Sequence, residues 1–136
     1  SGIYGPGRNA LASAHAGKSR RLVKPGQVFN RIHVADIAQA TVLAAIGKIG
    51  GIFNITDNEP APPQDVVEHA HRLLELEHPP EIDFETADLS AMARSFYGEN
   101  KRVSNQRSKT LLGMDYMYSN YRTALDNMLA DGSWKG

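Results

Sequence analysis

Lys101 and Arg102 form the part of this sequence best suited to binding an anion. Ser104 follows them and is expected to cap a helix that ends at Leu112. The backbone N–H groups at a helix N-terminus, together with two neighbouring cationic side chains, could hold a phosphate or a carboxylate. The same residues are also compatible with a solvated basic patch beside an ordinary serine cap, so both interpretations stay open.

A glycine-rich loop, Gly5-Pro6-Gly7, follows a short apolar run near the start of the chain. Together with Gly2 it has the spacing Gly-x-x-Gly-x-Gly, but its context is wrong for a dinucleotide-binding fingerprint. Such a fingerprint opens a helix and is followed by an acidic residue after a second strand, whereas Pro6 stiffens this loop. We therefore expect a loop at the carboxyl edge of a sheet, where open α/β sheets bind their ligands.

Several histidines suggest either proton transfer or metal binding. His33 stands three residues before Asp36 at an expected strand-to-helix corner. It is either half of an acid–base pair or a buried imidazole bonded to the backbone, and the second interpretation is favoured. His69 and His71 lie two residues apart on one expected helix, so they diverge by about 200° around its axis and cannot share an ion. We therefore predict no metal site.

We find no catalytic constellation in the sequence. It contains no cysteine, and no serine lies in a nucleophile-elbow sequence. Tyr97 is followed by Lys101, but Gly98 between them is expected to end the helix that carries Tyr97. We therefore do not count these two residues as a catalytic pair, and we expect this chain to bind rather than to catalyse.

The composition is that of a globular protein of one-domain size without a strongly charged partner. Of the 136 residues, 41% are hydrophobic, and 15 basic side chains balance 15 acidic ones. This balance predicts no binding to nucleic acid or to an anionic membrane. No apolar stretch approaches the ~20 residues of a membrane span. The absence of cysteine fits a cytoplasmic location.

Apolar periodicity and turn residues predict alternating strands and helices that must position these groups. We expect short strands at residues 2–4, 21–23, 28–34, 51–56 and 81–85. We expect helices at residues 10–16, 36–46, 62–74, 90–97 and 104–112, and a last helix capped by Ser119. Residues after Asp131 are expected to be disordered. About five short strands are too few for a complete doubly wound sheet, so the predicted fold is part of an α/β fold.

Four stretches of the chain occur in an order and spacing that match one known family. They are Gly2-Ile3-Tyr4-Gly5-Pro6-Gly7, Arg31-Ile32-His33-Val34-Ala35-Asp36-Ile37-Ala38, Ile52-Phe53-Asn54-Ile55, and Arg102 through Leu111-Leu112-Gly113. They resemble the C-terminal half of the extended and atypical short-chain dehydrogenases/reductases, the NAD-dependent epimerase/dehydratase family. The second stretch is similar to the motif Phe-x-His-Val-Asp-Asp-x-Ala of that family, and Tyr121-Arg122-x-x-Leu125 is similar to its closing helix.

The resemblance covers almost the whole chain. It implies a fold in which one half binds the cofactor and the other binds the substrate. It implies the C-terminal portion of a Rossmann-like NAD(P)-binding fold with a small, mostly helical substrate-binding lobe, over residues 1–131, followed by a tail at 132–136. A Rossmann half absent from this sequence would precede it and would bind NAD or NADP. In active members that half also carries a Tyr-x-x-x-Lys pair. This chain alone would neither catalyse nor bind the cofactor tightly.

The resemblance also implies which residues of this chain meet ligands. Residues on the nicotinamide side would be Tyr4, Gly5, Pro6 and Gly7. Residues facing a small-molecule substrate would be Phe29, Asn30 and Arg31, with Lys101 or Arg102 meeting an anionic group of that substrate.

Departures from the family pattern leave alternative functions open. Gly2 stands where the family often has a substrate-contacting asparagine, and Ala35 replaces the first aspartate of its motif. An arginine that sugar-nucleotide enzymes place near the position of Phe29 is absent. These differences argue against a standard nucleotide-sugar epimerase, and one alternative is an NAD(P)-sensing or regulatory module without turnover. Another is a self-standing interaction domain, whose exposed strand edges would pair two copies into a homodimer.

Overall fold

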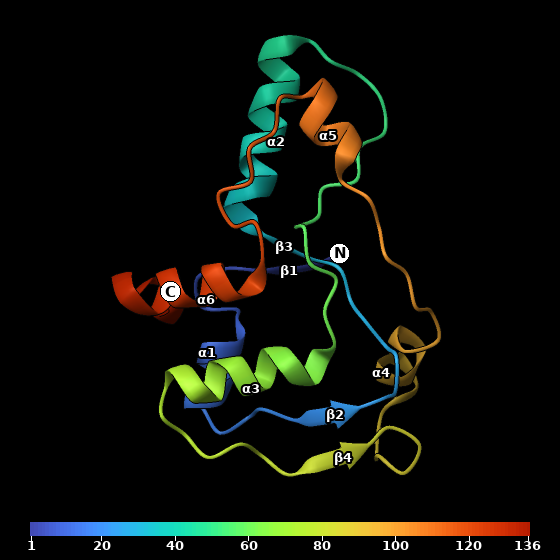
Figure 1. The fold of residues 1–136 in the computed structure, drawn as a ribbon, viewed down its shortest axis with the longest axis vertical. Helices are drawn as coiled ribbons and strands as arrows, with labels where there is room; N and C mark the ends of the chain where they lie inside the picture. Colours follow the sequence, from blue (N-terminus) through green and yellow to red (C-terminus); the bar gives the residue numbers. More distant parts are fainter.

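Short strands and helices alternate along the chain in this computed structural model, which describes residues 1–136 (Figure 1). The strands are β1 (Gly2–Tyr4), β2 (Arg21–Val23), β3 (Arg31–His33) and β4 (Glu81–Asp83). The helices are α1 (Ala10–His15), α2 (Val34–Gly47), α3 (Pro63–Leu73), α4 (Ala91–Phe96), α5 (Gln106–Leu111), α6 (Tyr121–Asp131) and the 3₁₀ helix η1 (Ser133–Lys135). None of these helices combines the length and hydrophobicity needed to cross a bilayer.

The strands form two separate parallel pairs, β1 with β3 and β2 with β4. In the first pair, Gly2 lies opposite Arg31 and Tyr4 lies opposite His33. Parallel strands need a long crossover, and here the crossover from β1 to β3 contains α1 and β2. The register therefore sets Gly2 and Arg31 side by side where this pair begins, and Tyr4 and His33 where it ends.

Three small apolar clusters hold the elements together. The largest lies among α1, α3, α6 and η1 and contains Leu11, Ala14, Ala61, Ala70, Tyr121, Leu125, Met128 and Trp134. A second joins β3 and α2 to the segment after α5 through Ile32, Ala40, Leu112, Met114 and Tyr116. A third lies behind β2 and β4 and contains Leu22, Phe84 and Ala87. Figure 1 shows α2 with α5 at one end of the molecule and β2 with β4 at the other.

All six expected helices are present, the strands at 2–4 and 21–23 are confirmed, and the strand expected at 81–85 ends at Asp83. Asn9 caps α1 by accepting a hydrogen bond from the Ala12 N–H, and β2 spans the expected residues. The caps of the last two helices differ by one residue from those expected. The N-cap residues are Asn105 for α5 and Asn120 for α6, rather than Ser104 and Ser119.

Two strand predictions are wrong in whole or in part. Residues 51–56 form no strand, because none of them joins a ladder of backbone hydrogen bonds. The backbone hydrogen bond to β3 comes from the next residue, Asp57, whose N–H donates to the Arg31 carbonyl at 2.8 Å. The expected strand at 28–34 is reduced to β3. Phe29 instead forms an isolated antiparallel bridge with Ala61, and Val34 already begins α2.

The expectation of disorder after Asp131 is also wrong. Residues Ser133–Lys135 form η1, and Trp134 is buried in the largest apolar cluster. The Trp134 carbonyl accepts hydrogen bonds from the Asn9 side chain at 2.9 Å and from the Gly7 N–H at 3.2 Å. A large aromatic side chain buries enough apolar surface to order the short segment that carries it.

Asp36 fastens the start of α2 to the segment between α5 and α6. Its carboxylate is fully buried and accepts hydrogen bonds from the backbone N–H groups of Met117 at 2.8 Å and Tyr118 at 3.1 Å. Burial raises the pKa of this carboxyl, while the two N–H donors lower it. The first-turn position that the sequence suggested for Asp36 therefore serves a long-range contact as well as the helix dipole.

Replacing Asp36 with alanine is expected to lower the free energy of unfolding by about 2–4 kcal/mol, because two charge-assisted hydrogen bonds are lost. The measurement is urea denaturation followed by circular dichroism. Asp115→Ala, at an exposed position of the same segment, is the matched control and should change stability by less than about 0.5 kcal/mol. Equal effects of the two substitutions would contradict this role of Asp36.

Candidate functional site

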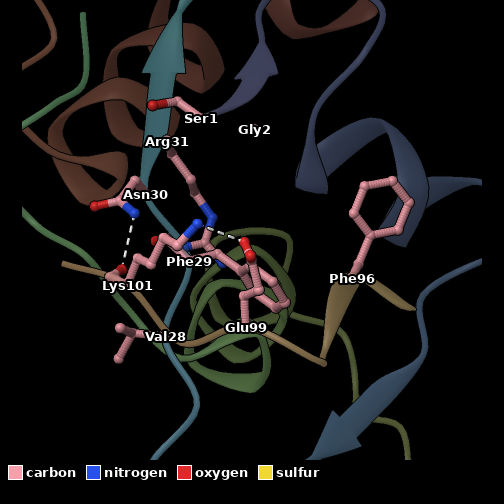
Figure 2. A pocket seen from close by; sticks show the side chains of 9 residues that line it. All are labelled: Ser1, Gly2, Val28, Phe29, Asn30, Arg31, Phe96, Glu99 and Lys101. Atoms are coloured by element: carbon pink, nitrogen blue, oxygen red, sulfur yellow. Dashed lines mark hydrogen bonds and ion pairs between the residues drawn. The ribbon is translucent and has the colours of Figure 1, made fainter. Parts of the chain in front are cut away.

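A cavity of about 480 Å³ opens beside the start of the β1–β3 pair (Figure 2). We name it the substrate cavity after the expectation that some of its residues face a substrate. It is lined by Ser1, Gly2, Val28, Phe29, Asn30, Arg31, Phe96, Glu99 and Lys101. It brings together four of the five residues expected to face a substrate. The fifth, Arg102, is exposed and does not line this cavity.

Asn30 positions the segment that carries Lys101. Its side-chain amide donates to the Lys101 carbonyl at 2.8 Å, and its side-chain oxygen accepts from the Val103 N–H at 2.9 Å. The Lys101 ammonium is paired with Glu99 at 2.7 Å, and both side chains are largely exposed. Such a surface ion pair contributes little to stability, so an anion that entered the cavity would compete with Glu99 for Lys101. Glu99 was not among the site residues expected from the sequence.

Aromatic side chains form two walls of the substrate cavity. The Phe29 ring meets the Tyr97 ring edge-on at 5.1 Å, and the Tyr97 ring stacks on Phe84 at 4.8 Å. Phe29 is thereby fixed against the cluster behind β2 and β4. Phe96 projects from α4 across the cavity from Asn30 and Lys101 (Figure 2), and it is 66% exposed.

Tyr97 and Lys101 stand at the four-residue spacing of a Tyr-x-x-x-Lys pair, but they belong to different parts of this site. α4 ends at Phe96, and Tyr97 is its C-cap residue. Burial raises the pKa of the Tyr97 hydroxyl, while Lys101 lies beyond the helix and pairs with Glu99. The two side chains therefore do not share a helical face, as a proton-transfer pair of this spacing would require.

Arg31 lies between the substrate cavity and a second, smaller one. One terminal nitrogen of its guanidinium donates to the carbonyls of Phe29 at 3.0 Å and Ala61 at 2.9 Å. Burial lowers the pKa of Arg31, and the nearby Asp57 opposes that change. The second cavity, which we call the apolar cavity, has a volume of about 200 Å³ and is lined by Gly2, Ile3, Tyr4, Ala10, Arg31, Val66, Tyr121 and Leu125.

The residues expected on the nicotinamide side lie at the carboxyl end of β1. Tyr4 lines the apolar cavity, whereas Gly5, Pro6 and Gly7 line neither of the two cavities. A Cβ atom on Gly5 would lie only 2.7 Å from the Val34 side chain, so glycine is required there by the close approach of α2. The N–H groups of Gly5 and Gly7 already donate to backbone carbonyls within the chain.

His33 is the buried, backbone-bonded imidazole that we expected. It is 4% exposed, and its Nδ1 accepts a hydrogen bond from the Ala35 N–H at 3.2 Å. Burial lowers its pKa. The ring also packs against Tyr118, with a centroid distance of 3.8 Å, and meets the Tyr4 ring edge-on at 5.4 Å.

Asp57 is a buried acid that was not among the site residues expected from the sequence. It is 2% exposed, and one carboxylate oxygen accepts from the Glu59 N–H at 3.0 Å while the other has no partner. The Tyr4 hydroxyl and the His33 Nε2 are also buried without partners. Burial raises the pKa of Asp57 from 3.8 to about 7, because Arg31 and the Glu59 N–H only partly offset the lost hydration.

Titration of the Asp57 carboxyl is expected to lower the free energy of unfolding as pH rises from about 4 to about 7. In that range the folded chain keeps the Asp57 proton and the unfolded chain loses it, so each rise in pH favours unfolding. A single group changes the free energy of unfolding by at most about 1.4 kcal/mol per pH unit. Denaturation of Asp57→Asn, which cannot ionise, should give a flatter profile over this range.

Asp88→Asn removes an exposed carboxyl group and is the control for this measurement. Its pH profile should match that of the unaltered chain between pH 4 and 7. If Asp57→Asn and the unaltered chain show parallel profiles between pH 4 and 7, the Asp57 carboxyl does not hold its proton as described. The other ionisable groups that act on Asp57, namely Arg31, Glu59 and Asp36, are present in all three proteins.

No protein-family model and no curated protein matches the chain. Among solved structures, it is similar to a conserved protein of unknown function from Silicibacter pomeroyi DSS, with a TM-score of 0.88 and 51% identity. That match covers 96% of this chain and 46% of the other.

Two other neighbours have assigned activities. UDP-N-acetylglucosamine 4-epimerase from Bacillus cereus has a TM-score of 0.72 at 17% identity, over 100% of this chain and 45% of that protein. dTDP-glucose 4,6-dehydratase from Bacillus anthracis str. Ames, solved in complex with NAD, has a TM-score of 0.63 at 18% identity, over 98% of this chain and 44% of that protein.

The chain thus spans less than half the length of each of these proteins. Neighbours of this kind have been solved with NAD or NADPH, and at such low identity they establish the fold alone. This chain has the mixed α/β fold of the C-terminal portion of Rossmann-like epimerases and dehydratases.

Proposed function

We propose that this chain is the substrate-binding portion of an NAD(P)-dependent epimerase/dehydratase-like or oxidoreductase-like protein and is not catalytic alone. The observation that carries this proposal is the substrate cavity, which gathers Phe29, Asn30, Arg31 and Lys101 from two distant segments. The fold supports it, because the chain matches one portion, less than half of the length, of neighbours that are an epimerase and a dehydratase. We further propose that the protein acts on a small molecule in the cytoplasm.

The Gly5-Pro6-Gly7 loop differs from a dinucleotide-binding loop in its backbone hydrogen bonds. The N–H groups of Gly5 and Gly7 donate to the carbonyls of Arg8 and Trp134, so they are not free to bind a pyrophosphate as a dinucleotide loop does. A cofactor would therefore be held by a separate cofactor-binding half, where it would supply hydride transfer. Tyr4 and the Gly5-Pro6-Gly7 loop would contact its nicotinamide side by packing only.

A non-catalytic NAD(P)-sensing or regulatory module is the second candidate. Gly2 favours it, because the substrate cavity receives no side chain at the position where the related family often has asparagine. The presence of a Tyr-x-x-x-Lys pair in the cofactor-binding half would favour the enzyme, and its absence would favour the sensor.

NADH is expected to bind this chain only when a cofactor-binding half is supplied. The test joins the chain to the portion of the Silicibacter pomeroyi protein that lies outside the match, and compares NADH fluorescence titrations of the joined protein and of the 136-residue chain. Binding by the joined protein, at least about tenfold tighter than by the chain, supports the proposal. Equal affinity of the two would contradict it.

The isolated chain is expected to self-associate through the edge of β1. In the β1–β3 pair each strand is paired along one edge only, and Ile3 is 52% exposed. An exposed apolar edge favours pairing with a second copy. Sedimentation across the micromolar range should show a homodimer, which Ile3→Lys should weaken by about tenfold or more.

Met92→Lys is the matched control for self-association. Met92 is an exposed apolar residue on α4, outside both strand pairs, so adding a charge there should leave the dimer unchanged. A chain that stays monomeric over the whole concentration range, or a dimer that Ile3→Lys does not weaken, would exclude pairing through β1.

A further inference from the structure

The apolar cavity is large enough for one ring-sized group. Six of its eight lining residues are hydrophobic, and they come from β1, α1, α3 and α6. An enclosed apolar cavity of about 150 Å³ already binds benzene in another protein, and this cavity measures about 200 Å³. Its chemistry therefore suits an aryl ring or a branched alkyl group of similar size.

The apolar cavity adjoins the substrate cavity at Gly2 and Arg31, the two residues that line both. Gly2 has no side chain to separate them, and a Cβ atom there would lie 4.0 Å from the Arg31 Cγ. A ligand that spans both cavities would therefore pass beside Gly2 and Arg31.

Arg31 offers free hydrogen-bond donors at this junction. Both of its hydrogen bonds come from one terminal nitrogen, so the Nε and the other terminal nitrogen have no partner within the chain, and neither is sealed from solvent. A guanidinium presents donors in a fixed fork that matches a carboxylate or a carbonyl oxygen.

The charge of Arg31 is not neutralised by direct contact. Asp57 acts on it electrostatically, but no ion pair forms between them. Lys101, the other cation of the substrate cavity, is already paired with Glu99. Arg31 is therefore the cation best placed to bind an oxygen of a ligand that enters the apolar cavity.

We infer that the substrate is a small aryl or branched-alkyl compound with an adjoining carboxylate or carbonyl oxygen. Its apolar group occupies the apolar cavity, its oxygen accepts hydrogen bonds from Arg31, and the remainder lies in the substrate cavity between Phe29 and Phe96. This inference rests on the proposed function and names the substrate class for the same site.

The experiment titrates the ¹⁵N-labelled chain with phenylacetate, phenylacetone, benzyl alcohol and acetate, and follows backbone amide shifts by NMR. Phenylacetate or phenylacetone should shift the amides of Ile3, Arg31 and Val66. The better of the two should bind at least about tenfold tighter than benzyl alcohol or acetate, because hydrogen bonds to a charged group and ring burial act together. Preference for phenylacetate identifies a carboxylate, and preference for phenylacetone identifies a carbonyl.

Val66→Phe fills the apolar cavity from α3 and should weaken binding of the preferred ligand at least about tenfold. Val67→Phe places the same side chain on the same helix at a position outside the cavity and should not. Arg31→Met, which removes the charge and the donors, should remove the preference over benzyl alcohol. Val66→Phe keeps the proposal testable if loss of the Arg31 contacts to Phe29 and Ala61 impairs folding.

Equal affinity for phenylacetate, phenylacetone and benzyl alcohol would overturn the role of Arg31. Binding that Val66→Phe leaves unchanged, or no shift at Ile3 and Val66, would overturn the use of the apolar cavity. The titration contains no nicotinamide cofactor, so its failure is distinguishable from failure of the proposed function, which is measured by NADH binding to the joined protein.

Discussion

Arg31, which is half-buried, makes the contacts on which both the fold and the site depend. Its side chain joins the carbonyls of Phe29 and Ala61, while its own carbonyl accepts from the Asp57 N–H and the Thr56 hydroxyl. The segment from Thr56 to Ala61 is thereby held against β3 without a strand ladder. Partly burying a cation costs free energy unless its donors find acceptors or water. Here the Phe29 and Ala61 carbonyls serve one nitrogen, and Arg31 itself lines both cavities.

Local patterns predicted most helices of this fold because their signals lie within a few residues of each other. Asn9 caps α1 and prolines open α3, and both residue types are typical of a helix start. Predictions failed where the outcome depends on distant partners. Residues 51–56 have the composition of a strand but no neighbouring strand to pair with, and Trp134 is ordered by a cluster that includes Leu11, far away in sequence.

The candidate site could be predicted only as far as family resemblance reaches. The family resemblance predicted Phe29, Asn30, Arg31 and Lys101 as substrate-facing residues, and these four residues line one cavity. Phe96 and Glu99 were not predicted as site residues, because nothing in the sequence shows that α4 and the loop after it lie across from β3. Asp57 was missed for a related reason, since its burial depends on tertiary packing rather than on the residues next to it in the sequence.

The contact between Trp134 and the residues near Gly7 limits how early these residues can pack during synthesis. Leu11 and Trp134 share one apolar cluster, and Asn9 and Gly7 both donate to the Trp134 carbonyl. During synthesis, the first helix leaves the ribosome long before its last packing partner exists. Because both strand pairs are parallel and no hairpin is present, no local sheet can form early in its place. The residues around Gly7 and Asn9 therefore complete their native packing only after Trp134 has been translated.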